Sequence, residues 1–442
     1  MRANRSIGLV MQLTSQQGRE QALTVNSYYE ATVTRPSTYA KLQGRHETDV
    51  CIVGGGLAGL SAAIDLAQSG FKVLVLEANR FGWGASGRNG GQALVDIACG
   101  METILAQVGP ADAKRVWQFS LDALDLIHER RAQFDIDCDW QVGYLAFAKN
   151  ARKAAALRKN TDYYARHFGF DQTRWIPPNE LSQWIASPTF HSGVLDPISG
   201  HLHPLKYLLG LVAAAQSLGV VLCEGSVVLT ADDQGLVCTA EGQVQAKKVL
   251  LAGNVYLDHV APQLRPRIMP VGTYIGTTTP LSAQRINALI PSRAAVCDTN
   301  FVLDYFRPTI DNRLLMGGLC SYSTRTPSNL QATMRGRVHS VFPQLADVEV
   351  DFAWGGFVDI TMNRAPDFGR IGSNTYYLQG FSGHGLALTG IAGRLAAKAI
   401  AGDASGFDVF AKINHRPFPG GRLLRMPSLV LAMAWFRLMD IL

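Results

Sequence analysis

One stretch near the start of the chain limits the possible folds more than any other. Residues 49–77 read DVCIVGGGLAGLSAAIDLAQSGFKVLVLE: an apolar strand, a glycine turn, a helix, and a second apolar strand that ends in an acid. A GxGxxG motif alone is weak evidence for nucleotide binding. This one is accompanied by both strands, the helix and the terminal acid of a dinucleotide-binding βαβ unit. The sequence therefore predicts an α/β domain of the Rossmann type.

Each residue of this unit has a physical reason for its position. Gly54 permits a tight turn, Gly56 lets the backbone approach a pyrophosphate, and Gly59 lets the helix pack closely on the strand. The helix begins at Leu57–Ala58, where unpaired N–H groups and the positive end of the helix dipole favour phosphates. Glu77 ends the second strand, where a carboxylate can hold a ribose diol. We expect these residues to bind the adenosine and pyrophosphate end of a dinucleotide.

Composition narrows the class of protein. The chain has 442 residues, of which 47% are hydrophobic and 17% charged, with a formal net charge of +6. These values are typical of a well-buried protein of two or three domains. No basic run is interleaved with aromatics, which argues against nucleic-acid binding. Seven cysteines without metal-ligand spacing, and an N-terminus without a long apolar core, predict reduced thiols, no metal site and a cytoplasmic location.

Two further glycine-rich stretches are candidates for contacts with the same ligand. Residues 78–92 read ANRFGWGASGRNGGQ, and five glycines here suit a loop whose N–H groups face a polar or planar group. A flexible surface loop is the alternative. Residues 376–385 read YYLQGFSGHG and precede an apolar helix. This strand, turn and helix predict another helix N-terminus beside an anion or an electron-rich ring.

The rest of the chain alternates between patterns typical of two domains. We expect an α/β fold (α+β overall) in which the Rossmann-like domain is joined by a discontinuous antiparallel-sheet domain. The expected ranges are 1–48 for a polar, irregular N-terminal arm, 49–136, 191–264 and 366–426 for the Rossmann-like domain, 137–190 and 265–365 for the second domain, and 427–442 for a C-terminal helix. Residues 354–366 are expected to be too irregular for a plain strand. The C-terminal helix is too short to span a bilayer, and surface association with a membrane is the alternative to packing on the body.

Taken in order, these motifs resemble the D-amino-acid oxidase superfamily of FAD-dependent amine oxidoreductases. The similarity covers about residues 45–425, and within the superfamily the chain is most similar to the γ-glutamylputrescine oxidases. Besides the βαβ unit, the supporting stretches are SYYEAT (27–32), ASGRNGGQ (85–92), GVLDPISG (193–200), GHLHPL (200–205), DNRLLMGG (311–318), FPQL (342–345), QGFSGHG (379–385) and RPFPGGR (416–422).

The resemblance implies an FAD-binding domain and a sheet that covers the substrate. Glu77 would bind the adenosine ribose, Val228 would pair its backbone with adenine, and the 383–385 turn would lie by the pyrimidine edge of the flavin. The implied cofactor-binding residues are Gly54, Gly56, Leu57, Ala58, Gly59, Glu77, Ala78, Ala85, Ser86, Arg88, Asn89, Gly90, Gly91, Gln92, Val228, Ala252, Gly253, Gly383, His384, Gly385 and Leu386. Relatives with covalent FAD carry a cysteine after the Pro366 region, but residues 369–379 contain none. We therefore expect non-covalent FAD.

The implied reaction is oxidation of an amine, most simply γ-glutamylputrescine, by hydride transfer to the flavin. Water would hydrolyse the imine to an aldehyde and ammonia, and molecular oxygen would take up the electrons as hydrogen peroxide. Some oxidase relatives use a lysine to activate oxygen, whereas residues 269–274 contain none. Two alternatives therefore remain: an oxidase or dehydrogenase of an N-methylated or other amino acid such as sarcosine, and a non-catalytic dinucleotide-binding protein. The sequence leaves the oligomeric state open.

Four residues are catalytic candidates, although the cofactor carries the chemistry and no strong base is required. His203 could face the flavin, with a capping or packing histidine as the alternative. His384, between glycines at a helix start, is expected near the flavin through its backbone N–H. Tyr305 and Trp354 are candidates for an aromatic wall around the amine, with simple core packing as the alternative. Charged candidates for substrate contacts are Arg364, Arg370 and Asp359, with surface salt bridges as the alternative for the arginines.

Overall fold

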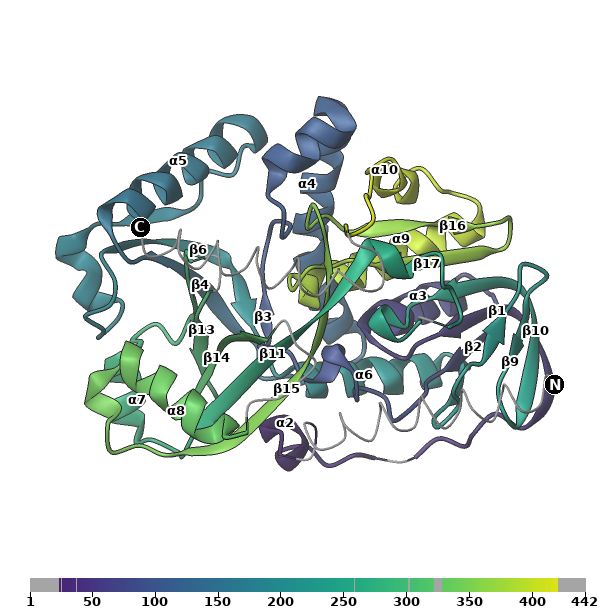
Figure 1. The fold of residues 1–442 in the computed structure, drawn as a ribbon, viewed down its shortest axis with the longest axis horizontal. Helices are drawn as coiled ribbons and strands as arrows, with labels where there is room; N and C mark the ends of the chain where they lie inside the picture. The colour runs from purple at the N-terminus through teal and green to yellow at the C-terminus, as the bar shows by residue number, and fades with distance from the viewer. Residues whose placement is uncertain are drawn as a thin grey trace.

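The computed structural model describes residues 24, 26–36, 38–257, 259–300, 303–321 and 328–419. Two sheets lie side by side, one on the right and one on the left of Figure 1, and the long strands β11 and β15 of the left-hand sheet run diagonally toward the right-hand one. The expected extreme N-terminus and C-terminal helix 427–442 fall outside the described residues. No helix in the described part of the chain is long and apolar enough to cross a membrane.

The first sheet is the predicted Rossmann-like sheet. Its strands run in the order β16-β17-β10-β1-β2-β7, and the β8–β9 hairpin is attached to β10. The five strands β17, β10, β1, β2 and β7 are parallel, as expected for apolar strands joined by crossovers. The strands are β1 (Gly44–Val53), β2 (Val73–Leu76), β7 (Val221–Cys223), β8 (Thr230–Ala231), β9 (Leu236–Cys238), β10 (Gly242–Leu251), β16 (Asp367–Ile371) and β17 (Thr375–Gln379).

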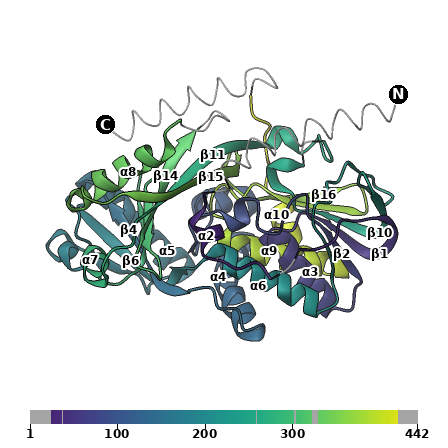
Figure 2. The same ribbon diagram turned by 90° about the horizontal axis from the view of Figure 1, so that it is seen from below.

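Helices cover one face of this sheet, and α3 and α9 lie against each other in both ribbon views (Figures 1 and 2). The apolar faces of the helices and alternate strand residues such as Val50 and Val75 form one continuous core. The helices outside the second sheet are α2 (Tyr28–Ala31), α3 (Leu57–Gln68), α4 (Met101–Gln133), α6 (Pro204–Ser217), α9 (Gly385–Ala401) and α10 (Phe407–Ala411). Helix α4 is kinked at Gly109, whose φ of 78° is not helical.

The second sheet is antiparallel except at β4–β12, which confirms the predicted sheet class. Its order is β15-β11-β14-β13-β12-β4-β6-β3, with β5 paired to β6. Helices α7 (Ala283–Leu289) and α8 (Leu330–Val341) pack on its outer face, and α5 (Ala151–Phe168) lies nearby. The strands are β3 (Gln92–Ala93), β4 (Gln141–Ala148), β5 (Arg174–Ile176), β6 (Ser192–His201), β11 (Ile268–Thr278), β12 (Ala295–Asp298), β13 (Tyr305–Pro308), β14 (Leu314–Ser321) and β15 (Val350–Thr361). Thus β3 and β6 join this sheet although they come from ranges expected in the first domain.

Two local expectations were wrong. Residues 354–361 are not irregular, because β15 pairs with β11 along almost its whole length. A Cβ built on Gly355 would lie 2.6 Å from the Tyr274 ring, so glycine here reflects a close approach rather than a broken strand. The N-terminal arm is not irregular throughout either. Its Ser27 side chain caps α2, both Tyr28 and Tyr29 are buried, and β1 already begins at Gly44.

Candidate functional site

The glycine turn of the βαβ unit is enclosed by backbone on two sides. The N–H of Gly54 donates to the carbonyl oxygen of Leu76 (2.8 Å), and a Cβ built on Gly54 would lie 2.6 Å from the Ala252 oxygen. A Cβ on Gly59 would lie 2.1 Å from the Gly54 oxygen. These positions tolerate only glycine without a backbone shift. The turn therefore lies at the edge where β1, β2 and β10 end, which is where ligands bind in open α/β sheets.

Glu77 turns its carboxylate back toward this turn. Oε2 accepts a hydrogen bond from the N–H of Gly55 (2.9 Å), and Oε1 accepts one from Asn79 (2.9 Å). Burial raises the pKa of Glu77, while these N–H groups and that of Ala78 act in the opposite direction. The residue is partly buried, and each carboxylate oxygen keeps a lone pair beyond these two bonds. This geometry suits a carboxylate that accepts from a ribose diol.

The glycine-rich loop after Glu77 is fixed to the start of α3. Ser86 Oγ accepts from the N–H of Leu57 (3.1 Å). Asn89 Nδ2 donates to the carbonyl oxygens of Ala85 and Ser86 (3.0 Å each), and its Oδ1 accepts from the N–H of Gly91 (2.9 Å). The loop is thus an ordered segment held by its own side chains, not a loose surface connection.

Arg88 and Trp354 tie this loop to the second sheet. Arg88 Nη1 donates to the carbonyl oxygen of Gly355 (2.9 Å), and its guanidinium lies 4.8 Å from the centre of the Trp83 ring. Trp354 Nε1 donates to the carbonyl oxygen of Arg88 (2.9 Å). Trp354 is 0% exposed and packs edge-on against Tyr29, so its bond to the loop is made from a fixed position in the core.

Tyr305 lies on the face of the second sheet that is turned toward the loop. A Cβ built on Gly90 would lie 2.5 Å from the Tyr305 ring, so glycine permits this contact. Cys297 pairs with Tyr305 across β12 and β13 and therefore shares its face. Gln92 Nε2 donates to the carbonyl oxygen of Val296 (3.0 Å), which fixes the end of the loop at the same sheet.

The turn before α9 leaves its helix N-terminus open. His384 occupies the N-cap position but makes no side-chain cap bond; its Nε2 instead pairs with the carbonyl oxygen of Val95 (3.3 Å). Burial lowers the pKa of His384, so the ring is neutral at neutral pH. Gly383 has a φ of 85°, and a Cβ built there would meet open space. The backbone at Gly383 therefore borders open space near the positive end of α9, which begins at Gly385.

These features fit an FAD molecule. The N-cap residues of α3 and α9 make no side-chain cap bond, which is also true of α4 and α10. The start of α3 contacts Ser86 of the loop 85–92, and α9 packs on β3, which begins at the end of this loop. N–H groups at a helix start need a partner, and phosphate oxygens and the electron-rich pyrimidine edge of a flavin are suitable acceptors. The residues at Gly54–Gly59 would hold the pyrophosphate, Glu77 the ribose, and the two glycine-rich loops the flavin ring.

Sequence comparison agrees with this geometry. The family described as "FAD dependent oxidoreductase" matches residues 49–399. The chain belongs to this family of FAD-dependent oxidoreductases. It is 40% identical, over 94% of its length and 98% of the relative, to gamma-glutamylputrescine oxidoreductase of Escherichia coli (strain K12). It is also 38% identical to the probable oxidoreductase OrdL of Haemophilus influenzae, over 94% of this chain and 97% of that protein.

Solved structures show the same fold at lower identity. Glycine oxidase from Bacillus cereus superposes with a TM-score of 0.69 at 18% identity, covering 84% of this chain and 99% of that chain. L-Proline dehydrogenase from P. horikoshii gives a TM-score of 0.68 at 19% identity, with 80% and 94% covered. The resemblance to this family, the fold class and the enzyme class predicted from the sequence are thereby confirmed. The protein is an FAD-dependent oxidoreductase.

His203 has a structural task at the start of α6. Its Nδ1 accepts from the N–H of Lys206 (3.2 Å), which is the N-cap bond of the helix. Its Nε2 lies 3.1 Å from Thr32 Oγ1. Burial and the positive charge of Arg307 lower the pKa of His203 to about 3. Both ring nitrogens are thus engaged by protein groups, which is the capping arrangement that the sequence left open as the alternative.

The charged candidates lie in different surroundings. Arg370 forms a surface pair with Asp408 (2.7 Å), and Arg364, at a φ of 59°, lies close enough to His384 to lower its pKa. Asp359 is buried and accepts from the N–H of Gly380, and burial raises its pKa to about 7. It therefore anchors the turn that leads to α9.

At the adenine end, the Val228 carbonyl accepts from His259 Nε2 (2.7 Å). Val228 is buried among the residues that pack beneath the first sheet. Its contact with adenine stays a prediction, as do the individual cofactor contacts assigned from the sequence.

Sequence reasoning missed three residues of this region: Tyr29, Tyr144 and Arg307. Tyr29 donates from its hydroxyl to the carbonyl oxygen of Asn89 (2.8 Å). Tyr144 lies on the same face as Cys297, and burial raises its pKa well above the ordinary value. The motif SYYEAT pointed to Tyr29 only as a resemblance, and no local pattern marks the other two.

Proposed function

We propose that the protein oxidises γ-glutamylputrescine in putrescine catabolism, with dioxygen as the electron acceptor, in the cytoplasm. One amine, one dioxygen and one water would give one aldehyde, one ammonia and one hydrogen peroxide. The observation that carries this proposal is the 40% identity to gamma-glutamylputrescine oxidoreductase over nearly the full length of both chains. The free cysteines of the described chain are consistent with a reducing compartment.

The residues facing the loop 85–92 would bind and orient the amine. When bound, FAD supplies the two-electron acceptor and the chain supplies position and polarity. We assign Tyr305, Cys297 and Tyr144 to the wall along which the aliphatic chain lies, because they share one face of the second sheet. An aromatic and weakly polar wall excludes water and favours the neutral amine over the ammonium form.

His384 would add no positive charge of its own to this space. Its pKa is lowered by burial, so its ring adds no cation that would repel an approaching ammonium group. We also propose that the flavin is held without a covalent bond, since residues 369–379 contain no cysteine. Denaturation followed by filtration should release all the yellow colour from the protein; colour that stays with the polypeptide would contradict this.

The substrate test is anaerobic reduction of the enzyme-bound flavin. We expect γ-glutamylputrescine to bleach the absorbance of the holoenzyme at micromolar to millimolar concentration, and putrescine, sarcosine and D-amino acids to do so at least about 100-fold less efficiently. Such a ratio corresponds to about 2.7 kcal/mol of discrimination. Preferred reduction by sarcosine would move the assignment to N-methylated amino acids, and no reduction by any amine would overturn the proposal.

The electron acceptor is tested separately. After flavin reduction, air should restore the oxidised spectrum and release one hydrogen peroxide for each aldehyde formed. Rapid reduction by the amine combined with negligible reoxidation by air would show a dehydrogenase that passes electrons elsewhere. This outcome matters because residues 269–274 contain no lysine of the kind that some oxidase relatives use.

A further inference from the structure

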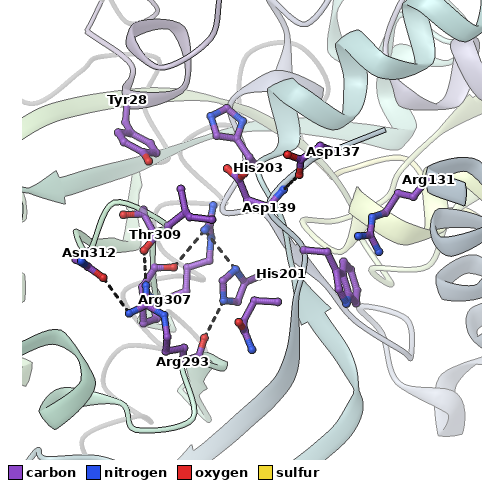
Figure 3. Close-up of a pocket in the computed structure, with 14 residues that line it drawn as sticks. Tyr28, Arg131, Asp137, Asp139, His201, His203, Arg293, Arg307, Thr309 and Asn312 are labelled. Atoms are coloured by element: carbon purple, nitrogen blue, oxygen red, sulfur yellow. Dashed lines mark hydrogen bonds between the residues drawn. The ribbon is translucent and has the colours of Figure 1, made fainter. Parts of the chain in front are cut away.

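A cavity lies beside the glycine-rich loop, where its lining residue Arg307 donates to the carbonyl oxygen of Gly90. Its volume is about 380 Å³, and Figure 3 shows Arg293, Arg307 and Asn312 on one side of it and Arg131, Asp137 and Asp139 on the other. Its walls come from α2, the end of α4, the strands β4 and β6, and the turn between β13 and β14. A space of this volume accommodates a small molecule.

The cavity is bordered by guanidinium groups without carboxylate partners. Among the described residues, no carboxylate lies within ion-pair distance of Arg293, Arg307 or Arg131, whereas many other arginines of the chain are paired with acids. Arg307 is only 4% exposed. A buried charge without a counter-charge is unfavourable, so an anion that enters the cavity would gain Coulomb energy.

The two histidines of the cavity do not supply charge of their own. His201 Nε2 donates to the carbonyl oxygen of Arg293 (2.9 Å), and its Nδ1 faces Arg307 Nη1 (3.3 Å). Burial first, and then the charge of Arg307, lower the pKa of both His201 and His203. Both rings are therefore neutral, and the positive potential of the cavity comes from the guanidinium groups.

Two acids, Asp137 and Asp139, line the cavity opposite Arg293, but they neutralise its positive charge only in part. Asp139 is already paired with Lys206, whose Nζ lies 2.8 Å from Oδ1. Asp137 is exposed, and its Oδ1 accepts from the N–H of Asp139 (3.3 Å). The acids Asp137 and Asp139 thus lie at one side of the cavity, and Asp139 is neutralised by a lysine. On the arginine side the neighbouring acid is Asp311, which is already paired with Arg313 and accepts from Tyr28 and Thr309.

We propose that this cavity binds a small carboxylate at the side formed by Arg293, at a site separate from the amine-oxidising one. Arg293 Nη1 donates to Asn287 Oδ1 (2.9 Å) and Asn312 Oδ1 (3.1 Å), and Nη2 donates to the carbonyl oxygen of Thr309 (2.6 Å). These bonds fix the guanidinium and leave two of its five N–H groups for a ligand. Arg307 adds charge rather than hydrogen bonds, because its own donors are used internally.

Arg307 links the cavity to the loop that borders the flavin site. Its Nε donates to the carbonyl oxygen of Gly90 (2.7 Å), and its Nη2 donates to the Tyr29 hydroxyl (3.1 Å) and to the carbonyl oxygen of Leu202 (3.1 Å). Tyr29 in turn donates to the Asn89 oxygen. A carboxylate that attracts Arg307 therefore alters the groups that hold residues 89–90, so its binding is coupled to the flavin environment.

The test is calorimetric titration of the oxidised holoenzyme, without amine and at low salt, with acetate, succinate and glutamate. We expect one saturable site for at least one of these carboxylates, and a small change in the visible flavin spectrum with the same midpoint. Arg293→Gln should weaken binding at least 10-fold. Arg285→Gln is the matched control, because Arg285 is an exposed arginine paired with Asp347 (2.8 Å), and it should bind like the wild type.

Arg131→Gln serves as a second variant, since it removes a guanidinium from the opposite side without touching the Arg293 hydrogen bonds; we expect several-fold weaker binding. Flavin content and thermal unfolding would establish that each variant is folded. Absence of saturable binding by all three carboxylates, or unchanged affinity in both cavity variants, overturns the proposal. Because calorimetry needs no turnover, these results are independent of whether γ-glutamylputrescine is the substrate.

Discussion

In the described part of the chain, α6 and α9 each have a histidine as N-cap residue, and the two rings have different hydrogen-bond partners. At α6 the His203 ring turns inward and accepts the N–H of Lys206, so the helix start is satisfied by its own N-cap residue. At α9 the His384 ring turns away to the carbonyl oxygen of Val95, and the helix start keeps its N–H groups. Helix α3, whose N-cap is Gly56, also lacks a cap bond from its own N-cap residue, although the N–H of Leu57 at its start donates to Ser86 Oγ. Among these three helices, the two whose N-cap residue makes no cap bond are the ones where we place the cofactor, and the capped one has a structural task.

The largest effect is expected when a side-chain cap is introduced at the start of α3, because this tests whether that helix start binds the cofactor. Gly56→Asp places a favourable N-cap residue on the helix, but it adds a negative charge where the pyrophosphate would lie. A Cβ there would also lie 2.9 Å from Ser86 Oγ. We expect the dissociation constant for FAD to rise at least about 1000-fold, or about 4 kcal/mol. The purified variant should be colourless yet folded, as measured by flavin absorbance and circular dichroism.

Helix α8 provides the matched control. Its N-cap residue Asn329 already accepts from the N–H of Ala332 (3.2 Å) and lies on the outer face of the second sheet. Asn329→Asp should therefore leave the flavin content unchanged. A Gly56→Asp protein that retained one FAD per chain would contradict the role assigned to the uncapped helix start.

The capped helix should show itself in the pH dependence of stability. The pKa of His203 falls from an ordinary value of 6.5 to about 3 in the folded protein, so the unfolded chain binds a proton between these values and the folded chain does not. The contribution of His203 to the free energy of unfolding is therefore complete above pH 6.5. It declines as the pH falls toward 3, by about 1.4 kcal/mol per pH unit for one such group. Denaturant unfolding at pH 7, 6 and 5 measures this slope.

His203→Asn is the informative variant, because asparagine also caps helices but does not titrate in this range. Its unfolding free energy should depend less steeply on pH than that of the wild type. Equal slopes for the two proteins would show that His203 is not held neutral in the folded state.

Asp359, which holds the turn before α9, should give the unfolding free energy a pH dependence of the opposite sign. Burial raises the pKa of Asp359 from 3.8 to about 7, so between these values the folded chain holds a proton that the unfolded chain has lost. This contribution to stability is present below pH 3.8 and declines as the pH rises toward 7, over a slightly narrower range than that of His203. Because the two slopes oppose each other between about pH 4 and 6.5, variants rather than the wild type reveal them.

Asp359→Asn keeps an oxygen acceptor for the N–H of Gly380 without the titration. The unfolding free energy of this variant should fall less than that of the wild type between pH 5 and 7. A decline that is identical in both proteins would mean that Asp359 is ionised in the folded state throughout this range.

The same comparison shows what could be predicted from sequence. The βαβ unit was accessible because Gly54, Gly59 and Glu77 act through neighbours a few residues away or one strand along. The task of each histidine could not be predicted, because both are N-cap residues and the sequence does not show which way each ring turns. Arg307 was missed for a related reason: its partner Gly90 lies 217 residues away, and nothing near Arg307 in sequence indicates that contact.

Buried strands gave a further difficulty. In β15, Gly355–Gly356 reads as a loop by composition, although the neighbouring Tyr274 ring requires the small residue at 355. Helices α7 and α8 were likewise absent from the expectations for 265–365, because the surrounding Thr, Val and Tyr content favoured strands throughout. Pattern-based reasoning was therefore most successful where one local unit forms the site, and least successful where the second sheet meets it.

Exchange of each histidine for alanine is the mildest test of the comparison. His203→Ala removes a side-chain cap and should lower the unfolding free energy by about 1 kcal/mol, while the flavin spectrum and the rate of anaerobic reduction stay near wild type. His384→Ala keeps the backbone N–H at the start of α9 but changes the surroundings of the turn. We expect it to alter the flavin spectrum and slow reduction several-fold, with a smaller loss of stability. The unfolding free energy and the rate of anaerobic flavin reduction, measured on both variants, test these two roles. A slower reduction in His203→Ala at unchanged stability would show that His203 at the start of α6, and not His384, acts in the reaction.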